Sequence, residues 1–266
     1  IDTSWNRLPD GKVVGDLLAK VQKEFNYSNP GASVPDLLKA YTLIQQLQDP
    51  FWRNQKSEEI KKIIAACSGL YLEAVADVQE TTPGSTIKVK LEAINRSTNA
   101  WTLNRVETYP KAAVNWNNQV LSNNKDLNTS FDLSLPTDYE YTAPYYLKEE
   151  GTVGMYTVND RQLIGKPDVQ RPTQVTFYLS IHGVELPYTR KVVYKYNDDV
   201  KGEVYQPLDI VPAVTSTIKE KVYIFPKNRS REVRVLVKAG KENLSGTVQL
   251  QVPSDWKVTP EQQQVT

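Results

Sequence analysis

The sequence has 266 residues, a formal net charge of +1, and 39% hydrophobic and 24% charged residues, which is typical of a folded globular protein. A charge this close to zero gives no general attraction to nucleic acid or to an anionic membrane. No run of about 18 apolar residues predicts a transmembrane helix. We therefore expect neither nucleic acid nor a membrane span.

The single cysteine and the single histidine limit the chemistry that the chain can perform. One cysteine excludes an internal disulfide, and one histidine excludes a zinc site with two or three imidazoles. Cys67 is predicted to be a small buried residue in a helix. His182 is predicted to be a solvated residue on the polar face of a strand rather than a general base.

The segment up to about Gly69 has helical periodicity. In residues 12–25 the apolar side chains recur at helical spacing, and Asn29, Pro30 and Gly31 interrupt the pattern. A second helix is predicted to begin at Ser33, in a capping box with Asp36, and a third at Asp49. Three short amphipathic helices bury one another's apolar stripes poorly, so each is expected to pack on something else as well.

From Leu70 the hydrophobic period changes to two, which predicts β-strands. About seven short strands with turn residues between them suggest an immunoglobulin-like antiparallel β-sandwich over residues 70–200. The predicted strands are residues 70–76, 87–93, 100–108, 112–121, 129–135, 153–158, 173–182 and 184–196.

Residues 196–212 contain an acidic turn, a glycine and two prolines, and are predicted to be a linker. A second strand series follows at residues 220–225, 231–238 and 246–252. These strands are too few for a complete sandwich. We expect three parts: a helical segment 1–69, a sandwich 70–200, and a second, truncated immunoglobulin-like domain 201–266.

One aromatic cluster is the candidate ligand surface. Tyrosines offer flat apolar rings with hydroxyl groups, which suit sugar stacking or protein binding. The alternative is that these rings pack against the end of the sandwich or a neighbouring domain. The five tryptophans are predicted to be core or interdomain residues. The cluster consists of Tyr139, Tyr141, Tyr145, Tyr146 and Tyr156.

Several strings of the sequence, in order and across most of the chain, resemble the region downstream of the catalytic domain in large bacterial PIG-L/LmbE-like deacetylases. The final stretch, "GTVQLQVPSDWKVTPEQQQ", is similar to an accessory β-domain found in those proteins and beside some glycoside hydrolases. The strings are "DTSWNRLPDGK", "NPGASVPDLLKAYTLIQQL", "IAACSGLYLEAVAD", "TPGSTIKVKLEAINRS", "APYYLKEEGTVGMYTVNDRQLIGKPD" and "YKYNDDVKGEVYQPLDIVP".

The resemblance implies a parent protein that removes N-acetyl groups from sugar-type substrates with a divalent metal, usually zinc. The family's metal site begins at a His-Pro-Asp-Asp motif, and nothing here matches it, since His182 is followed by Gly183. No catalytic or metal-binding residue is therefore carried over to this chain. Zinc is expected in the missing catalytic domain, and export from a bacterial cell is expected for the parent.

The sequence thus predicts a mainly β protein with an N-terminal helical segment that docks on a catalytic domain of the same polypeptide. The fragment itself is expected to be non-catalytic. The alternatives are a carbohydrate-binding or protein-interaction sandwich module, or a structural spacer. The tyrosine cluster motivates the first alternative, with a glycan as the possible partner.

Overall fold

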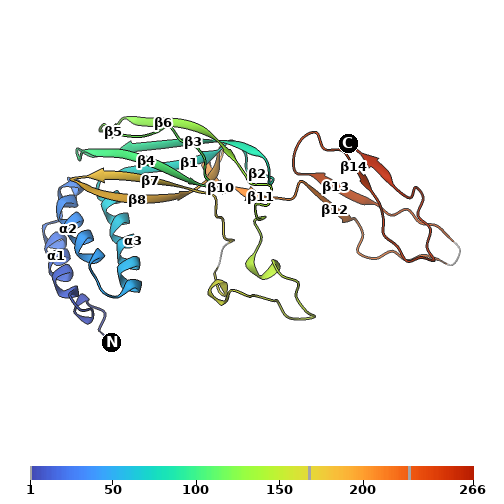
Figure 1. The fold of residues 1–266 in the computed structure, drawn as a ribbon, viewed down its shortest axis with the longest axis horizontal. Helices are drawn as coiled ribbons and strands as arrows, with labels where there is room; N and C mark the ends of the chain where they lie inside the picture. Colours follow the sequence, from blue (N-terminus) through green and yellow to red (C-terminus); the bar gives the residue numbers. More distant parts are fainter. Residues whose placement is uncertain (1, 167–168, 227–228) are drawn as a thin grey trace. The chain divides into compact units, whose positions relative to one another are not determined.

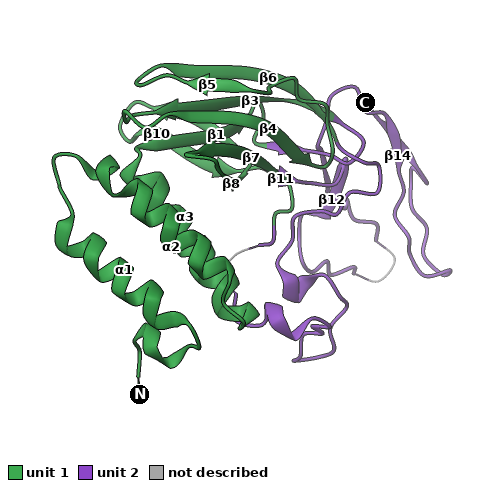
Figure 2. Cartoon of the chain, turned by 60° about the vertical axis from the view of Figure 1, so that its left-hand side comes forward, with its two compact units in different colours: residues 1–79, 86–134, 171–208 green, residues 80–85, 135–170, 209–266 purple. Residues whose placement is uncertain are grey.

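The computed structural model describes residues 2–166, 169–226 and 229–266. The chain is rich in β-strands with a few helices, as the sequence predicts. It divides into two compact units, shown in Figure 2. Unit 1 contains residues 1–79, 86–134 and 171–208, and unit 2 contains residues 80–85, 135–170 and 209–266.

The three predicted helices are present: α1 (Gly11–Glu24), α2 (Val34–Gln45) and α3 (Pro50–Cys67). Asp49 caps α3 as predicted, because its carboxylate accepts hydrogen bonds from the backbone N–H groups of Phe51 (2.9 Å) and Trp52 (3.2 Å). The helix ends at Cys67, and Gly69, two residues beyond that end, has a φ of +56° that favours glycine.

The predicted cap of α2 is wrong. Ser33 makes no capping hydrogen bond with its side chain, because it has right-handed helical geometry at the end of the 3₁₀ turn η2 (Pro30–Ser33). Asp36, the expected partner in the capping box, instead forms ion pairs with Lys20 (3.1 Å) and Lys39 (2.8 Å). The carboxylate therefore connects α2 to α1.

Two β-sheets form a sandwich in unit 1 (Figure 1). The larger sheet has the order β10-β9-β1-β3-β6, and the smaller has the order β5-β4-β7-β8. Most neighbours are antiparallel, but β9 runs parallel to β1. The strands are β1 (Leu70–Ala76), β3 (Thr86–Asn95), β4 (Trp101–Tyr109), β5 (Gln119–Leu121), β6 (Asp126–Ser134), β7 (Gln174–Ile181), β8 (Val184–Lys191), β9 (Val193–Asp198) and β10 (Gly202–Pro207).

The core lies between the two sheets. On β1 and β3 the positions that the period of two predicts are buried, and on β1 Glu73 of the opposite face is buried as well. Trp101 and Phe177 are fully buried, and burial of each such side chain stabilises the fold by about 1.5–3 kcal/mol. The buried residues of these strands include Leu70, Leu72, Ala74, Ala76, Ile87, Val89, Leu91, Ala93, Val175, Leu179 and Ile181.

Helix α3 packs directly on the sandwich. The Nζ of Lys61, a residue only 7% exposed, donates a hydrogen bond to the carbonyl of Pro187 (2.9 Å), and the hydroxyl of Tyr188 donates to the carbonyl of Lys61 (3.2 Å). Ile60 and Ile64 are buried on the same helix. The helices and the sandwich therefore belong to one compact unit, which differs from the expected division at residue 69.

The structure also corrects several predicted strands. The predicted linker 196–212 is wrong, because residues 193–207 form the β9–β10 hairpin. In residues 112–121 only β5 is a strand, and in 153–158 there is no strand, only a turn closed by an isolated bridge between Thr152 and Met155. His182 lies not on a strand but in the two-residue turn between β7 and β8, with φ of +47°.

Unit 2 contains small two-stranded sheets. β2 (Glu80–Thr81) pairs with β11 (Asp209–Ile210), β12 (Val214–Ile218) with β13 (Val235–Ala239), and β14 (Gly246–Val248) with β15 (Gln263–Val265). The predicted strand 220–225 is absent from the described chain. Among the described residues of 211–266, none is buried. The described residues of 211–266 therefore form no core of their own.

Candidate binding surface

The candidate tyrosines lie in the long connection between β6 and β7, which belongs mostly to unit 2. Its described residues form two short 3₁₀ turns, η3 (Tyr145–Leu147) and η4 (Arg161–Leu163), and it appears in Figure 1 as a yellow-green excursion. Long connections without regular structure are uncommon in compact domains, and many of them carry function.

Thr142 anchors the beginning of this connection to β11. Its backbone N–H donates to the carbonyl of Ile210 (2.9 Å), and its hydroxyl accepts the N–H of Ile210 (3.1 Å). The same hydroxyl lies 3.1 Å from a carboxylate oxygen of Asp209. The tyrosines that follow therefore start from a fixed point of unit 2.

Three of the five candidate tyrosines form one cluster. The rings of Tyr145 and Tyr146 are 5.3 Å apart and perpendicular, and those of Tyr146 and Tyr156 are 5.1 Å apart and tilted by 58°. The hydroxyl of Tyr145 accepts the backbone N–H of Gly165 (3.1 Å). Tyr146 is 38% exposed and Tyr156 is 68% exposed, so the outer faces of the cluster are open.

The other two candidates are not equivalent. Tyr139 is buried at 9% exposure, so its ring offers no open face to a ligand. Tyr141 is exposed, close in sequence to the Thr142 anchor. Periodicity could not separate these cases, because the connection has neither helical nor strand geometry.

Exposed aliphatic residues accompany the tyrosines. Met155 is 72% exposed, and Leu147, Val153 and Ile164 are also exposed. Lys148 pairs with Glu140 at 2.6 Å. We call residues 140–164 the arm. It is the chain's densest run of exposed large apolar side chains among the described residues.

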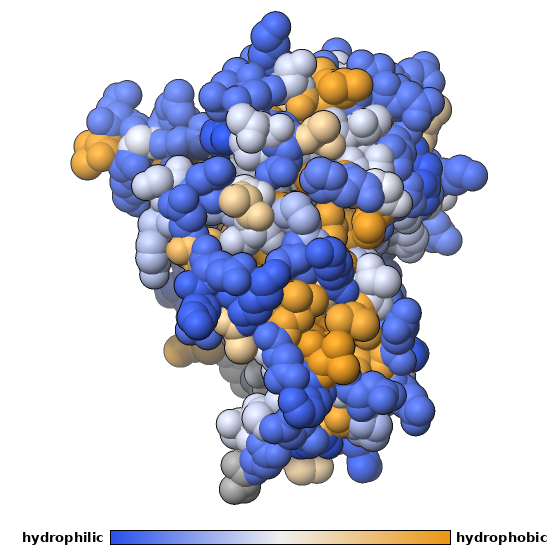
Figure 3. Space-filling model, turned by 90° about the vertical axis from the view of Figure 1, so that its left-hand side faces the viewer, coloured by the Kyte–Doolittle hydropathy of each residue, from blue (hydrophilic) through white to orange (hydrophobic). Residues whose placement is uncertain are grey.

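A second apolar surface lies on the helices. Val13, Phe51 and Ile63 are exposed there, and Figure 3 shows an apolar area bordered by polar side chains on the side that carries the helices. The guanidinium of Arg7 lies 3.9 Å from the ring centroid of Trp52. Part of the apolar stripe of α3, at Ile60 and Ile64, is buried and does not contribute to this surface.

The tryptophans have different environments. Trp101 and Trp116 are buried in the sandwich, as predicted for core residues. Trp5 and Trp52 are partly buried on the helical part, and Trp256 is 46% exposed in unit 2. Trp256 contacts Phe225 edge to face, with ring centroids 4.8 Å apart.

A polar network that sequence reasoning missed covers the outer face of the larger sheet. Glu73 on β1 accepts hydrogen bonds from Lys195 Nζ (2.8 Å) and from the hydroxyl of Tyr71 (2.7 Å). The hydroxyls of Tyr71 and Tyr205 lie 3.2 Å apart, and Tyr205 donates to Glu203. Sequence patterns did not indicate this network, because Glu203 and Tyr205 fall in the segment predicted as a linker.

Burial and hydrogen bonding act in opposite directions on Glu73. Its burial raises the pKa, but the hydrogen bonds from Lys195 and the two tyrosines outweigh it and hold the pKa below its ordinary value. Burial and the hydrogen bond to Glu203 raise the pKa of Tyr205. Glu73 is therefore a charged carboxylate that its neighbours neutralise. We interpret the network as one that stabilises the sheet.

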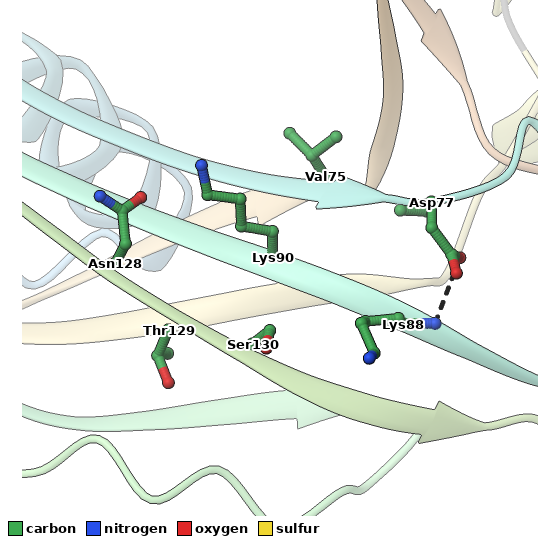
Figure 4. A pocket seen from close by; sticks show the side chains of 8 residues that line it. Val75, Asp77, Lys88, Lys90, Asn128, Thr129 and Ser130 are labelled. Atoms are coloured by element: carbon green, nitrogen blue, oxygen red, sulfur yellow. Dashed lines mark hydrogen bonds between the residues drawn. The ribbon is translucent and has the colours of Figure 1, made fainter.

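A hollow of about 570 Å³ lies beside this network on the same sheet (Figure 4). Val75 of β1 lines it, together with Lys88 and Lys90 of β3. The backbone N–H of Lys88 donates to Asp77 at 3.2 Å. The hollow is open to solvent and combines lysines with an aspartate, so it selects no single class of ligand.

The remaining candidates for chemistry are isolated. His182 is exposed in its turn, and Cys67 is half-buried at the end of α3, where burial raises the pKa of the thiol. No three histidine, cysteine or acidic residues group to hold a metal ion in residues 2–166, 169–226 and 229–266. Within those ranges no helix has the length and apolarity that crossing a bilayer requires.

Comparison with known proteins identifies no family. No family model matches the chain, and no curated protein matches it. Among solved structures it is similar to an alkylpurine DNA glycosylase, AlkC of Pseudomonas fluorescens bound to DNA with an abasic site analogue, at 7% identity and a TM-score of 0.22. That match covers 69% of this chain and 48% of the glycosylase, and is too weak to carry an argument.

Proposed function

We propose that this chain is a non-catalytic accessory region of a PIG-L/LmbE-like, metal-dependent N-deacetylase. Support comes from the order of the resembling strings along most of the chain and from its one histidine, too few for the family's metal site. In this proposal zinc and the catalytic residues belong to a separate catalytic domain of the same polypeptide, and the parent protein is exported.

The proposed role of the accessory region is to pack against that catalytic domain. The observation that carries this role is the exposure of apolar side chains on the helices, at Val13, Phe51 and Ile63, together with the apolar area in Figure 3 on the side that carries the helices. Exposed apolar residues that lie close together are typical of interfaces with other domains.

The proposal also treats residues 211–266 as part of a larger β-domain, since β10 belongs to the sandwich. Isolated two-stranded hairpins are marginally stable in water, and the described residues of 211–266 include no buried side chain. Further strands that cover Phe225 and Trp256 would give this part the core that it lacks.

The first test is an assay of the natural polypeptide that contains this chain. We expect zinc-dependent release of acetate from N-acetylglucosamine-type substrates, and none from residues 1–266 alone. Deacetylase activity of the purified 266-residue chain, or a natural polypeptide that has no His-Pro-Asp-Asp segment, would refute the proposal.

The second test addresses the packing role. The catalytic domain is expressed alone and followed by residues 1–266, and its melting temperature is measured by calorimetry. We expect a higher melting temperature with the accessory region, reduced by Val13→Ser and Ile63→Ser together. Equal melting temperatures in all three proteins would exclude the packing role.

The alternative function is carbohydrate binding by the cluster of Tyr145, Tyr146 and Tyr156, favoured by its open rings. Calorimetric titration of the chain with chitooligosaccharides tests it, with Tyr156→Ala as the variant that should lose binding.

A further inference from the structure

The arm, residues 140–164, leaves an unusual amount of apolar side chain in water. A soluble surface tolerates single apolar residues, but a dense run of them marks an interaction site. Tyrosine and methionine are enriched in protein interfaces, and both occur here. The exposed apolar residues of the arm are Tyr141, Tyr146, Leu147, Val153, Met155, Tyr156 and Ile164.

The geometry favours a protein partner over a sugar. A sugar ring stacks on an open aromatic face and needs hydrogen-bonding groups beside it. Here the rings of Tyr145 and Tyr146 are perpendicular and pack on each other, and the hydroxyl of Tyr145 is already bonded to Gly165. The exposed neighbours Leu147 and Met155 have no group that can bind a sugar hydroxyl strongly.

The charge of the arm argues against a second copy as the partner. The arm has four acidic and two basic residues. Glu140 is paired with Lys148, but Glu149 and Glu150 make no ion pair within the described parts of the chain. In an arm-to-arm dimer, two surfaces with the same excess of acidic over basic residues would meet, and like charges across an interface are costly. The arm therefore suits a different, basic surface.

We propose that the arm is a docking element that places its apolar side chains in a groove with a basic rim on a neighbouring folded domain. Resting on the proposed function, this neighbour is the catalytic domain of the same polypeptide. The anchor of Thr142 on β11 fixes the start of the arm, and the turn at residues 152–155 holds its distal part. From the sequence, docking on the catalytic domain was expected of the helices, and packing against a neighbouring domain was an alternative for the tyrosines.

Hydrogen–deuterium exchange tests the proposal on the natural polypeptide and on the 266-residue chain. We expect the amides of residues 145–157 to exchange at least tenfold more slowly in the natural polypeptide than in the isolated chain. The variant Leu147→Ser with Met155→Ser should remove this difference, and so should Glu149→Lys with Glu150→Lys. Val120→Ser, at an exposed position of β5, is the control and should leave it unchanged.

The possible results separate the docking proposal from the proposed function. Equal exchange of the arm in both proteins would overturn the docking proposal. Dimerisation of the isolated chain in sedimentation experiments would also overturn it, if the Leu147→Ser, Met155→Ser variant is monomeric. Binding of chitooligosaccharides through the arm would overturn it as well. Protection of the arm in a polypeptide without a His-Pro-Asp-Asp segment would support docking and refute the deacetylase assignment.

Discussion

Lys195 on β9 donates a hydrogen bond to Glu73 on β1, with 2.8 Å between Nζ and the carboxylate oxygen. The backbones of these strands pair only at Val75 with Val193 and Ala76 with Tyr194. The side-chain bond therefore adds to a short backbone pairing between the β9–β10 hairpin and the rest of the sheet. The Glu73 side chain is 8% exposed, so solvent screens this ion pair little.

Replacement of Lys195 should destabilise the sandwich. Lys195→Met leaves the buried Glu73 without its cation, and we expect a loss of about 1–3 kcal/mol in the free energy of unfolding. Urea denaturation measures it. Lys88→Met, an exposed lysine of the same sheet, is the control and should change stability by less than about 0.5 kcal/mol. Equal losses in the two variants would show that the ion pair does not stabilise the fold.

The same carboxylate should make stability depend on pH. The pKa of Glu73 is lower in the folded protein than its ordinary value of about 4.3. Its contribution is therefore fully present above the unfolded pKa and is lost as pH falls through the folded pKa. Between pH 6 and pH 3, wild type should lose more stability than Glu73→Gln. Parallel curves of the urea midpoint against pH for the two proteins would contradict this expectation.

Local patterns predicted the helices and most strands, and failed where long-range pairing decides the structure. The apolar spacing of residues 70–93 is visible in the sequence because each strand has one buried face. The ion pair of Lys195 and Glu73 is not visible in the sequence, because a parallel pairing of distant strands leaves no local pattern. Asp198, Asp199 and Gly202 have linker composition but form the tight turn of the β9–β10 hairpin.

The tyrosine cluster was predictable only in part. Composition drew attention to residues 139–156, and three of the five rings do meet. Whether each ring is exposed depends on how the connection folds back on β11, which no periodicity encodes. The exposed aliphatic residues of the arm, such as Met155, were missed because single apolar residues in a loop are unremarkable until their exposure is known.

Loss of the Tyr188 hydroxyl should loosen α3 from the sandwich. The Tyr188 hydroxyl is buried and donates to the Lys61 carbonyl at 3.2 Å. Tyr188→Phe removes this buried hydrogen bond, so we expect a loss of about 0.5–1.5 kcal/mol in global stability. Amides of α3 should also exchange faster with deuterium. Tyr178→Phe on the neighbouring strand removes an exposed bond to Glu107 and should have a smaller effect. An unchanged exchange rate in α3 would argue against this attachment.

In the turn at His182 and Gly183, asparagine at position 182 should stabilise the fold more than histidine does. Both residues have positive φ, +47° and +80°, and Ile181 pairs with Val184, which defines a two-residue hairpin turn of type I′. Asn-Gly is the favoured sequence for this turn, so His182→Asn should raise the free energy of unfolding by about 0.5 kcal/mol. His182→Val should lower it by about 1 kcal/mol or more, because a β-branched residue is strained at positive φ. Thermal unfolding of wild type and the two variants measures the order of their stabilities. A loss of stability in His182→Asn would mean that the imidazole makes a contact that the turn geometry does not require.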